Sequence, residues 1–182
     1  SVVGTHRTDG LLMGHNALGG SGLRDHIKIG ASGKVSTGAD IVKLLSQGAD
    51  YTNAARAMMM ATGCIQSQRC HTNTCPVGVA TQDPRRARAL VVADKSQRVT
   101  RYHEATVAET GQILASMGLS SPTEVRPHML RRVVGHLQTR SYAEMYDWLQ
   151  PGELLADPPK AWAADWLHAD PDTFRLDAQE ST

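Results

Sequence analysis

The stretch that decides the fold is residues 26–45, HIKIGASGKVSTGADIVKLL. Residues 26–30 show the short alternating pattern of side chains that is typical of a β-strand. A glycine-rich turn follows at residues 30–34. Ile41, Leu44 and Leu45 then recur at the spacing of one helix face. The stretch therefore predicts a strand, a turn and a helix in this order, which together form one βα unit.

A second βα unit follows directly. Gly48 is suited to end the first helix, and residues 49–53 predict another short strand. Residues 54–61 include three consecutive methionines and predict a buried helical turn. Two consecutive βα units predict an α/β fold with parallel strands over residues 1–63.

The remaining chain divides into a cysteine-containing loop at residues 64–83 and a helical segment at 84–182. The Asp-Pro pair at 83–84 suits a helix start, with Asp as the N-cap and Pro at the first helical position. The longest helical pattern covers residues 94–117, with Val99, Thr106, Val107, Ile113, Leu114 and Met117 near one face. Another helix is predicted from Pro122 to about residue 134, and the last residues, about 169–182, are expected to be loosely ordered.

Composition excludes several classes of protein. The 182 residues suffice for one domain, and a hydrophobic fraction of 41% supports a packed core. Nineteen basic and eighteen acidic residues nearly cancel, which argues against nucleic-acid binding and against a polybasic membrane patch. No apolar run approaches the roughly 20 residues of a membrane span. The cysteines are odd in number and confined to residues 64–75, which favours a reducing cytoplasm and a metal-binding role over disulfides.

The three cysteines have the spacing C-x5-C-x4-C in residues 64–76, CIQSQRCHTNTCP. Thiolates ligate iron and zinc, and three of them suit a cluster of three irons with one thiolate per iron. A structural zinc site needs four ligands, so His71 would have to join, although it directly follows Cys70. Three unligated buried cysteines are the remaining alternative, and the spacing alone leaves all three open.

The longer run at residues 63–82, GCIQSQRCHTNTCPVGVATQ, resembles the cluster loop of glutamate synthase. The likeness extends from about residue 10 to about residue 155 and is strongest at residues 22–95. In that family the three cysteines bind a [3Fe–4S] cluster beside FMN. The resemblance therefore implies Cys64, Cys70 and Cys75 as cluster ligands, with the cluster passing electrons one at a time.

The resemblance also implies a fold, namely the C-terminal portion of a (β/α)8 TIM-type barrel followed by an iron–sulfur loop and a helical tail. Barrel strands 7 and 8 would lie near residues 27–30 and 50–53, and phosphate sites in such barrels often follow these strands. The FMN phosphate would then bind the backbone amides of two short segments, which comprise Ser32, Gly33, Lys34, Ala55 and Arg56. A plain turn remains the alternative for the first segment. Lys28 could face the flavin ring or the end of the barrel.

The function implied is that of a glutamate-synthase-like oxidoreductase acting on CH–NH2 donors. The parent enzyme would form L-glutamate from 2-oxoglutarate and the nitrogen of ammonia or glutamine, with electrons from ferredoxin or a reductase subunit. Strands 1–6 would lie in a missing N-terminal barrel portion. The catalytic residues are therefore unknown, and we expect this segment to be inactive alone. The alternatives are a non-catalytic iron–sulfur or zinc-binding fragment and a related flavin oxidoreductase with another substrate.

Two minor features carry no predicted chemistry. Arg24 and Asp25 are expected to form a local ion pair of small value. The histidines outside the cysteine loop, His15 among them, are scattered and lack ligand spacing, so we expect them to be ordinary surface or core residues.

Overall fold

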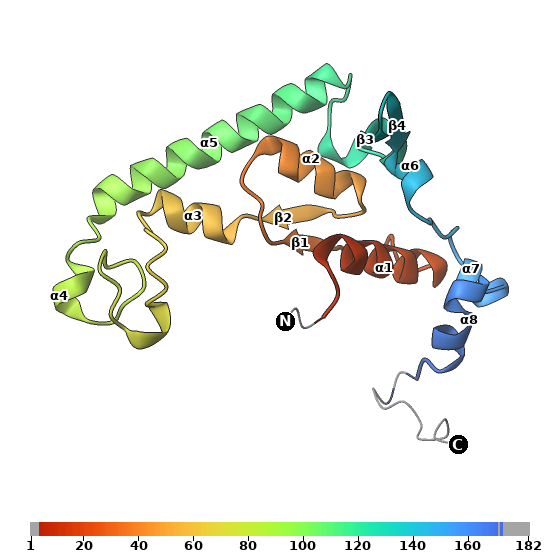
Figure 1. The fold of residues 1–182 in the computed structure, drawn as a ribbon, viewed down its shortest axis with the longest axis horizontal. Coiled ribbons are helices and arrows are strands. Elements are labelled where there is room, and N and C mark those ends of the chain that lie inside the picture. The colour runs from red at the N-terminus through yellow and green to blue at the C-terminus, as the bar shows by residue number, and fades with distance from the viewer. Residues whose placement is uncertain (1–3, 171, 173–182) are drawn as a thin grey trace.

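The structure is a computed structural model that describes residues 4–170 and residue 172 (Figure 1). Its first elements are α1 (Arg7–Gly20), β1 (Gly30–Ser32), α2 (Gly38–Ser46), β2 (Tyr51–Asn53) and α3 (Ala55–Ala61). After the cysteine loop come α4 (Pro84–Ala87), α5 (Val92–Ser116), β3 (Arg131–Gly135), β4 (Gln138–Ser141), α6 (Tyr142–Met145), α7 (Glu153–Ala156) and α8 (Lys160–Leu167). Short 3-10 helices lie at Cys70–Thr72, Pro122–Glu124 and Pro127–Met129.

The first two strands form a small parallel sheet. Gly30 lies opposite Tyr51, and the register continues in step to the end of both strands. The predicted parallel βα arrangement is therefore confirmed for this pair. β1 begins later than predicted because the amides of residues 26 and 27 donate back to the carbonyl of Leu23, at 3.0 and 3.2 Å, and form a turn.

Helix α2 packs between the sheet and α5 (Figure 1). Leu44 is buried in a cluster that includes β1, whereas Val42 is buried in a second cluster with residues of α5. The predicted single apolar face is wrong in part, because Ile41 packs against the first cluster and Leu45 against the second. A helix covered on two sides does not show a single-face pattern. The first cluster consists of Leu11, Ala31, Val35, Leu44 and Ala49, and the second of Val42, Leu114 and Val125.

The start of α2 is held by a capping box and by α5. Thr37 Oγ1 accepts the amide of Asp40 at 3.2 Å, and the Asp40 carboxylate accepts the amide of Thr37 at 3.1 Å. Glu109 of α5 accepts the amide of Gly38 at 2.8 Å. The position of the β1–α2 turn is thus tied to the long helix.

Two predicted apolar faces are only partly buried. On α5, Thr106 and Leu114 are buried as expected, but Val107 is 53% exposed. On α3, Met59 and Met60 are 37% and 39% exposed, so the predicted buried helical turn is wrong there. Within the described residues α3 packs mainly against α5, which leaves its other sides open.

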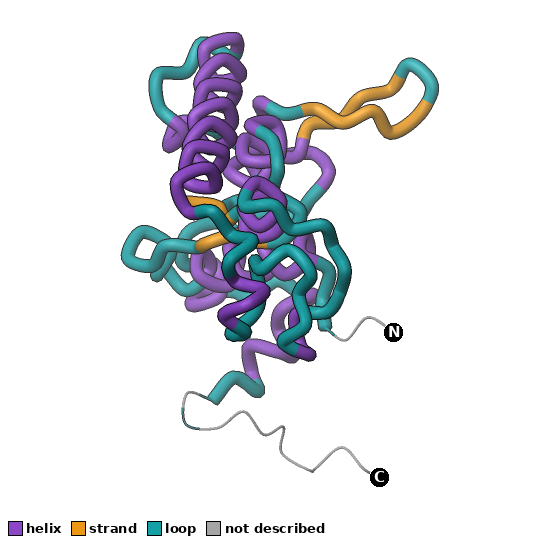
Figure 2. Tube along the Cα trace, turned by 90° about the vertical axis from the view of Figure 1, so that its left-hand side faces the viewer, coloured by secondary structure: helices purple, strands orange, loops and turns teal. Residues whose placement is uncertain are grey.

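The helix predicted from residue 122 to residue 134 is wrong. Pro122 and Pro127 each begin a 3-10 turn, and β3 and β4 then form an antiparallel hairpin with Arg131 opposite Ser141. Figure 2 shows the hairpin extending away from the body of the molecule. Proline interrupts a helix, and the β-branched pair Val133-Val134 favours a strand.

Beyond the hairpin the described chain contains the short helices α6, α7 and α8, separated by irregular segments. Of the stretch 169–182 that was expected to be loosely ordered, residues 171 and 173–182 lie outside the described residues. Among the helices that the structure describes, none combines the length and the apolar character that crossing a membrane requires.

Candidate flavin and cluster sites

Both segments that were predicted to bind the FMN phosphate lie at one edge of the parallel sheet. Because β1 and β2 run in the same direction, the turn after β1 and the start of α3 after β2 meet at their carboxyl edge. Gly33 and Lys34 in this turn have φ values of +98° and +52°, in the left-handed region. The structure therefore brings Ser32–Lys34 and Ala55–Arg56 to the same edge.

The amides at this edge are not equally available. Asp40 accepts the amides of Ser36 and Thr37, at 3.0 and 3.1 Å, so those donors are already used. Burial alone would raise the pKa of Asp40, but these bonds and those from the Ser36 and Thr37 side chains lower it. No side chain caps the start of α3, so the amides of Ala55 and Arg56 have no such partner. These two amides can therefore donate to a phosphate group.

A small cavity adjoins the β1–α2 turn, and we call it the carboxyl-edge cavity. It measures about 280 Å³ and is lined by His6, Arg7, Thr8, Gly33 and Lys34. Arg7 donates from Nη1 to the carbonyl of Gly33. Sequence reasoning did not single out His6 or Arg7, because no motif marks them and only the packing of α1 beside β1 brings them to the turn.

The three cysteines lie on the long loop between α3 and α4, and all are free thiols. Cys64 is half-buried, Cys70 is exposed at the start of a 3-10 helix, and Cys75 is buried. Within residues 4–170, no group of three or more His, Cys, Asp or Glu side chains is arranged to hold a metal ion. In this geometry neither the four ligands of a zinc site that includes His71 nor the three thiolates alone are gathered around one point. The loop places the cysteines in one region but does not converge them on one point.

The sulfur of Cys75 is surrounded by backbone donors. The N–H of Ala80 has the largest effect on its pKa and lowers it; burial opposes this, and the amides of residues 77–79 lower it further. The net pKa of the Cys75 thiol therefore lies below its ordinary value. The turn needs glycine at Gly78, which has φ +75° and where a Cβ would lie 2.5 Å from the carbonyl oxygen of Arg86. A favoured thiolate fits a role as an iron ligand.

Asn73 organises the loop before Cys75. It adopts a left-handed conformation with φ +59°, and its side-chain oxygen accepts the amide of Gln82 at 2.6 Å. Thr81 donates to the backbone oxygen of Asn73 at 2.8 Å. The two ends of the loop around Cys75 are thus joined, a positioning role that the sequence did not reveal.

Helix α5 brings positive charge to the residue before Cys64. Gly63 has φ +107°, and the position that a Cβ would occupy there lies 3.6 Å from Lys95 Nζ and 3.9 Å from Arg98 Nη1. Lys95 also pairs with Asp94 at 3.0 Å. Helix α5 therefore places two cations beside the residue that precedes Cys64.

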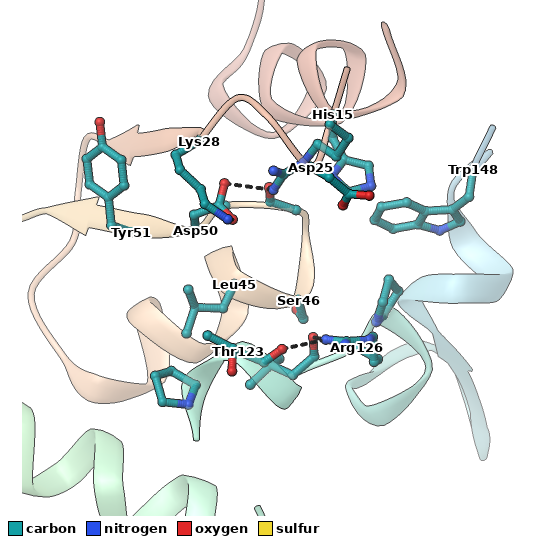
Figure 3. A pocket seen from close by; sticks show the side chains of 16 residues that line it. His15, Asp25, Lys28, Leu45, Ser46, Asp50, Tyr51, Thr123, Arg126 and Trp148 are labelled. Carbon is teal, nitrogen blue, oxygen red and sulfur yellow. Dashed lines mark hydrogen bonds and ion pairs between the residues drawn. The ribbon is translucent and has the colours of Figure 1, made fainter. Parts of the chain in front are cut away.

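The amino edge of the sheet carries a different cluster of charges (Figure 3). Arg24 pairs with Asp50 at 2.8 Å and donates to His15 Nδ1 at 3.1 Å, so the predicted Arg24–Asp25 ion pair is wrong. The reason is that Arg24 reaches across the turn to the residue that precedes β2. Lys28 lies 3.7 Å from Asp50 and is therefore at the edge opposite the β1–α2 turn.

This amino-edge cluster lines a larger cavity of about 710 Å³, with Lys28 and Asp50 toward one end and Trp148 at the other (Figure 3). Burial alone would raise the pKa of Asp50, but the amide of Ile29 and the guanidinium of Arg24 outweigh burial and lower it. Burial and Arg24 lower the pKa of His15. The network holds together the chain segments before β1 and β2.

The conserved region of glutamate synthase matches residues 2–120 of this chain. The glutamate synthase large subunit-like protein YerD of Bacillus subtilis is 46% identical over 101 residues, which cover 56% of this chain and 19% of that protein. The glutamate synthase [NADPH] large chain of Azospirillum brasilense is 32% identical over 149 residues, covering 79% of this chain and 10% of that protein. The ferredoxin-dependent glutamate synthase of Pyropia yezoensis is 38% identical over 117 residues, covering 64% of this chain and 7% of that protein.

The chain thus spans about a fifth or less of the length of these relatives. The matched region contains both βα units and the whole cysteine loop. Since that region covers well over half of the 182 residues, the chain belongs to the glutamate synthase family.

Proposed function

We propose that this segment is the phosphate-binding and cluster-binding part of a glutamate-synthase-like oxidoreductase. The parent enzyme forms L-glutamate from 2-oxoglutarate and the nitrogen of ammonia or glutamine. The observation that carries the proposal is the match of the glutamate synthase conserved region to residues 2–120, which include all three cysteines. The catalytic residues and the remaining barrel strands belong to the rest of the parent protein.

In this proposal β1 and β2 are strands 7 and 8 of a (β/α)8 barrel. The backbone amides of Ser32–Lys34 and Ala55–Arg56 hold the phosphate of FMN at the carboxyl edge. Three observations support this arrangement: the parallel pairing of the strands, the left-handed turn at Gly33 and the uncapped start of α3.

The thiolates of Cys64, Cys70 and Cys75 hold a [3Fe–4S] cluster in the same proposal. The lowered pKa of Cys75 and the two cations of α5 beside Gly63, the residue before Cys64, support it. When bound, FMN would supply hydride transfer and the cluster would supply one-electron transfer. The residues of this segment bind and position these groups, and the backbone amides around Cys75 favour its thiolate.

The electron donor of the parent enzyme is ferredoxin or a reductase subunit. The relatives include a glutamate synthase [NADPH] large chain and a ferredoxin-dependent glutamate synthase, which supports both kinds of donor as candidates. Three free cysteines also suit the reducing cytoplasm, where we place the enzyme.

The proposal is tested on the full-length parent protein, purified without oxygen. We expect bound FMN, iron in excess of zinc, and glutamate formed from 2-oxoglutarate and ammonia when a reduced electron donor is supplied. Cys75→Ser should lose iron and donor-driven turnover while retaining flavin.

Each alternative gives a different result in that experiment. One zinc per chain with no iron would establish a structural metal-binding segment instead. Bound flavin and iron without glutamate formation would point to a related flavin oxidoreductase with another substrate.

A further inference from the structure

The carboxyl-edge cavity contains more positive charge than the predicted phosphate turn alone provides. His6 and Arg7 come from the start of α1, and Lys34 comes from the turn after β1. No carboxylate is among its lining residues. The nearest acidic residues along the chain are Asp9, which is exposed in the first turn of α1, and Asp40, which is engaged by the start of α2. The cavity is therefore suited to an anion.

Arg7 is the better placed of the two cations, Arg7 and Lys34. Its Nη1 donates to the carbonyl of Gly33, which fixes the guanidinium beside the turn. A guanidinium has five N–H donors, so this bond leaves most of them for another acceptor. Within residues 4–170, no carboxylate lies within ion-pair distance of Arg7. An arginine held by a carbonyl but not neutralised by an acid can bind a phosphate in bidentate fashion.

The conformation of the β1–α2 turn also favours phosphate binding beside Arg7. Gly33 and Lys34 both have positive φ, and a Cβ added to Gly33 would lie 3.8 Å from Arg7 Cδ. The guanidinium therefore approaches the same two residues whose amides are proposed to hold the FMN phosphate.

We infer that Arg7, assisted by Lys34 and His6, is a phosphate-binding residue that makes the site select FMN over riboflavin. This inference rests on the proposed flavin site and deepens it. The amides of the turn would bind either the phosphate or a water, whereas the guanidinium adds a charge that only the phosphorylated flavin satisfies. The residue that gives selectivity for the phosphate thus lies on α1 and not in the two segments that follow β1 and β2.

The test compares FMN and riboflavin binding to the full-length protein after its flavin is removed, by fluorescence titration. We expect Arg7→Ala to weaken FMN binding about 10- to 100-fold, the effect of losing charge-assisted hydrogen bonds. Riboflavin binding should change by less than about twofold, since that ligand has no phosphate for Arg7 to bind. Arg7→Lys keeps the charge without the planar fork and should fall between the two.

Arg126→Ala is the matched control. Arg126 also donates to backbone carbonyls, those of Thr123 and Val125, but it lines the cavity at the amino edge. Its loss should change neither affinity. If Arg7→Ala fails to fold, Lys34→Ala carries the same test, with a smaller loss of FMN binding and unchanged riboflavin binding.

The possible outcomes distinguish the role of Arg7 from the presence of the flavin site itself. A wild-type protein that binds neither flavin would overturn the flavin site itself. A wild-type protein that prefers FMN, together with an Arg7→Ala variant of equal preference, would overturn the role of Arg7 alone. Equal weakening of FMN and riboflavin in that variant would reduce Arg7 to a structural tie between α1 and Gly33.

Discussion

The three cysteines of the loop differ in their surroundings, although the sequence presents them as equivalent. Cys75 is buried and receives backbone donors that lower its pKa, whereas Cys70 is exposed. The spacing of the cysteines was readable from the sequence. The amides around Cys75 and the bonds of Asn73 that close the loop were not, because they depend on backbone conformations between residues 73 and 82.

Asp50 is the second informative residue, and it was not singled out by its sequence context. We predict that Asp50→Asn lowers the free energy of unfolding by roughly 1 kcal/mol at pH 7, because Arg24 and the amide of Ile29 lose a charged partner. The folded-state pKa of Asp50 is lowered, so its contribution is fully present above the unfolded value of about 3.9. It is lost as the pH falls through the lower folded-state value.

Urea unfolding at pH 7 and in the acid range measures this effect. The difference between wild type and Asp50→Asn should shrink as the solution is acidified below about pH 4. Asp25→Asn is the control, since Asp25 is exposed and lies next to Arg24 in the turn before β1. Equal losses from both substitutions, or a difference independent of pH, would contradict the assignment.

At the scale of elements, the sequence predicted the βα order and the long helix but not how they pack. The apolar spacing of α2 showed one face, whereas the helix is buried on two sides by β1 and α5. The sequence-based prediction missed the hairpin because it gave the helix start at Ser121-Pro122 more weight than the β propensity of Val133 and Val134. Proline at 127 was the available signal that the helix could not continue.

The crossing of α2 and α5 depends on Gly38. A Cβ at that position would lie 2.5 Å from the backbone nitrogen of Thr110, which cannot move without displacing α5. We predict that Gly38→Ala destabilises the protein by about 1–3 kcal/mol in chemical unfolding. Gly111→Ala, which meets nothing within 4 Å, should be neutral or stabilising by up to about 1 kcal/mol. Comparable stability of the two variants would show that the helices do not cross so closely.

The hairpin contains an unfavourable pair. Arg132 lies directly opposite Arg140, and like charges in this position repel. We predict that Arg140→Glu stabilises the hairpin by about 0.2–1 kcal/mol, seen as slower hydrogen exchange of its amides. Arg101→Glu makes the same charge change at an exposed site on α5 and should leave those amides unchanged. Faster exchange in the Arg140 variant would contradict the register.

At the scale of the whole molecule, the sequence supported the family and the α/β class, and both are confirmed. The barrel stays a prediction, because a pair of parallel strands is common to many α/β folds. The carboxyl-edge cavity at His6 and Arg7 could not be predicted from the sequence either, because residues from α1 and the β1–α2 turn meet only in three dimensions. The chain corresponds to 19% or less of the length of the three relatives described.

Residues 64–75 are proposed to supply three thiolates to one three-iron cluster. The most direct test is electron paramagnetic resonance of the full-length protein after anaerobic reconstitution with iron and sulfide, recorded in the oxidised state. We predict a nearly isotropic signal close to the free-electron position that disappears in Cys70→Ala and persists in His71→Ala. Absence of the signal with one zinc per chain, or a signal that survives Cys70→Ala, would contradict the account.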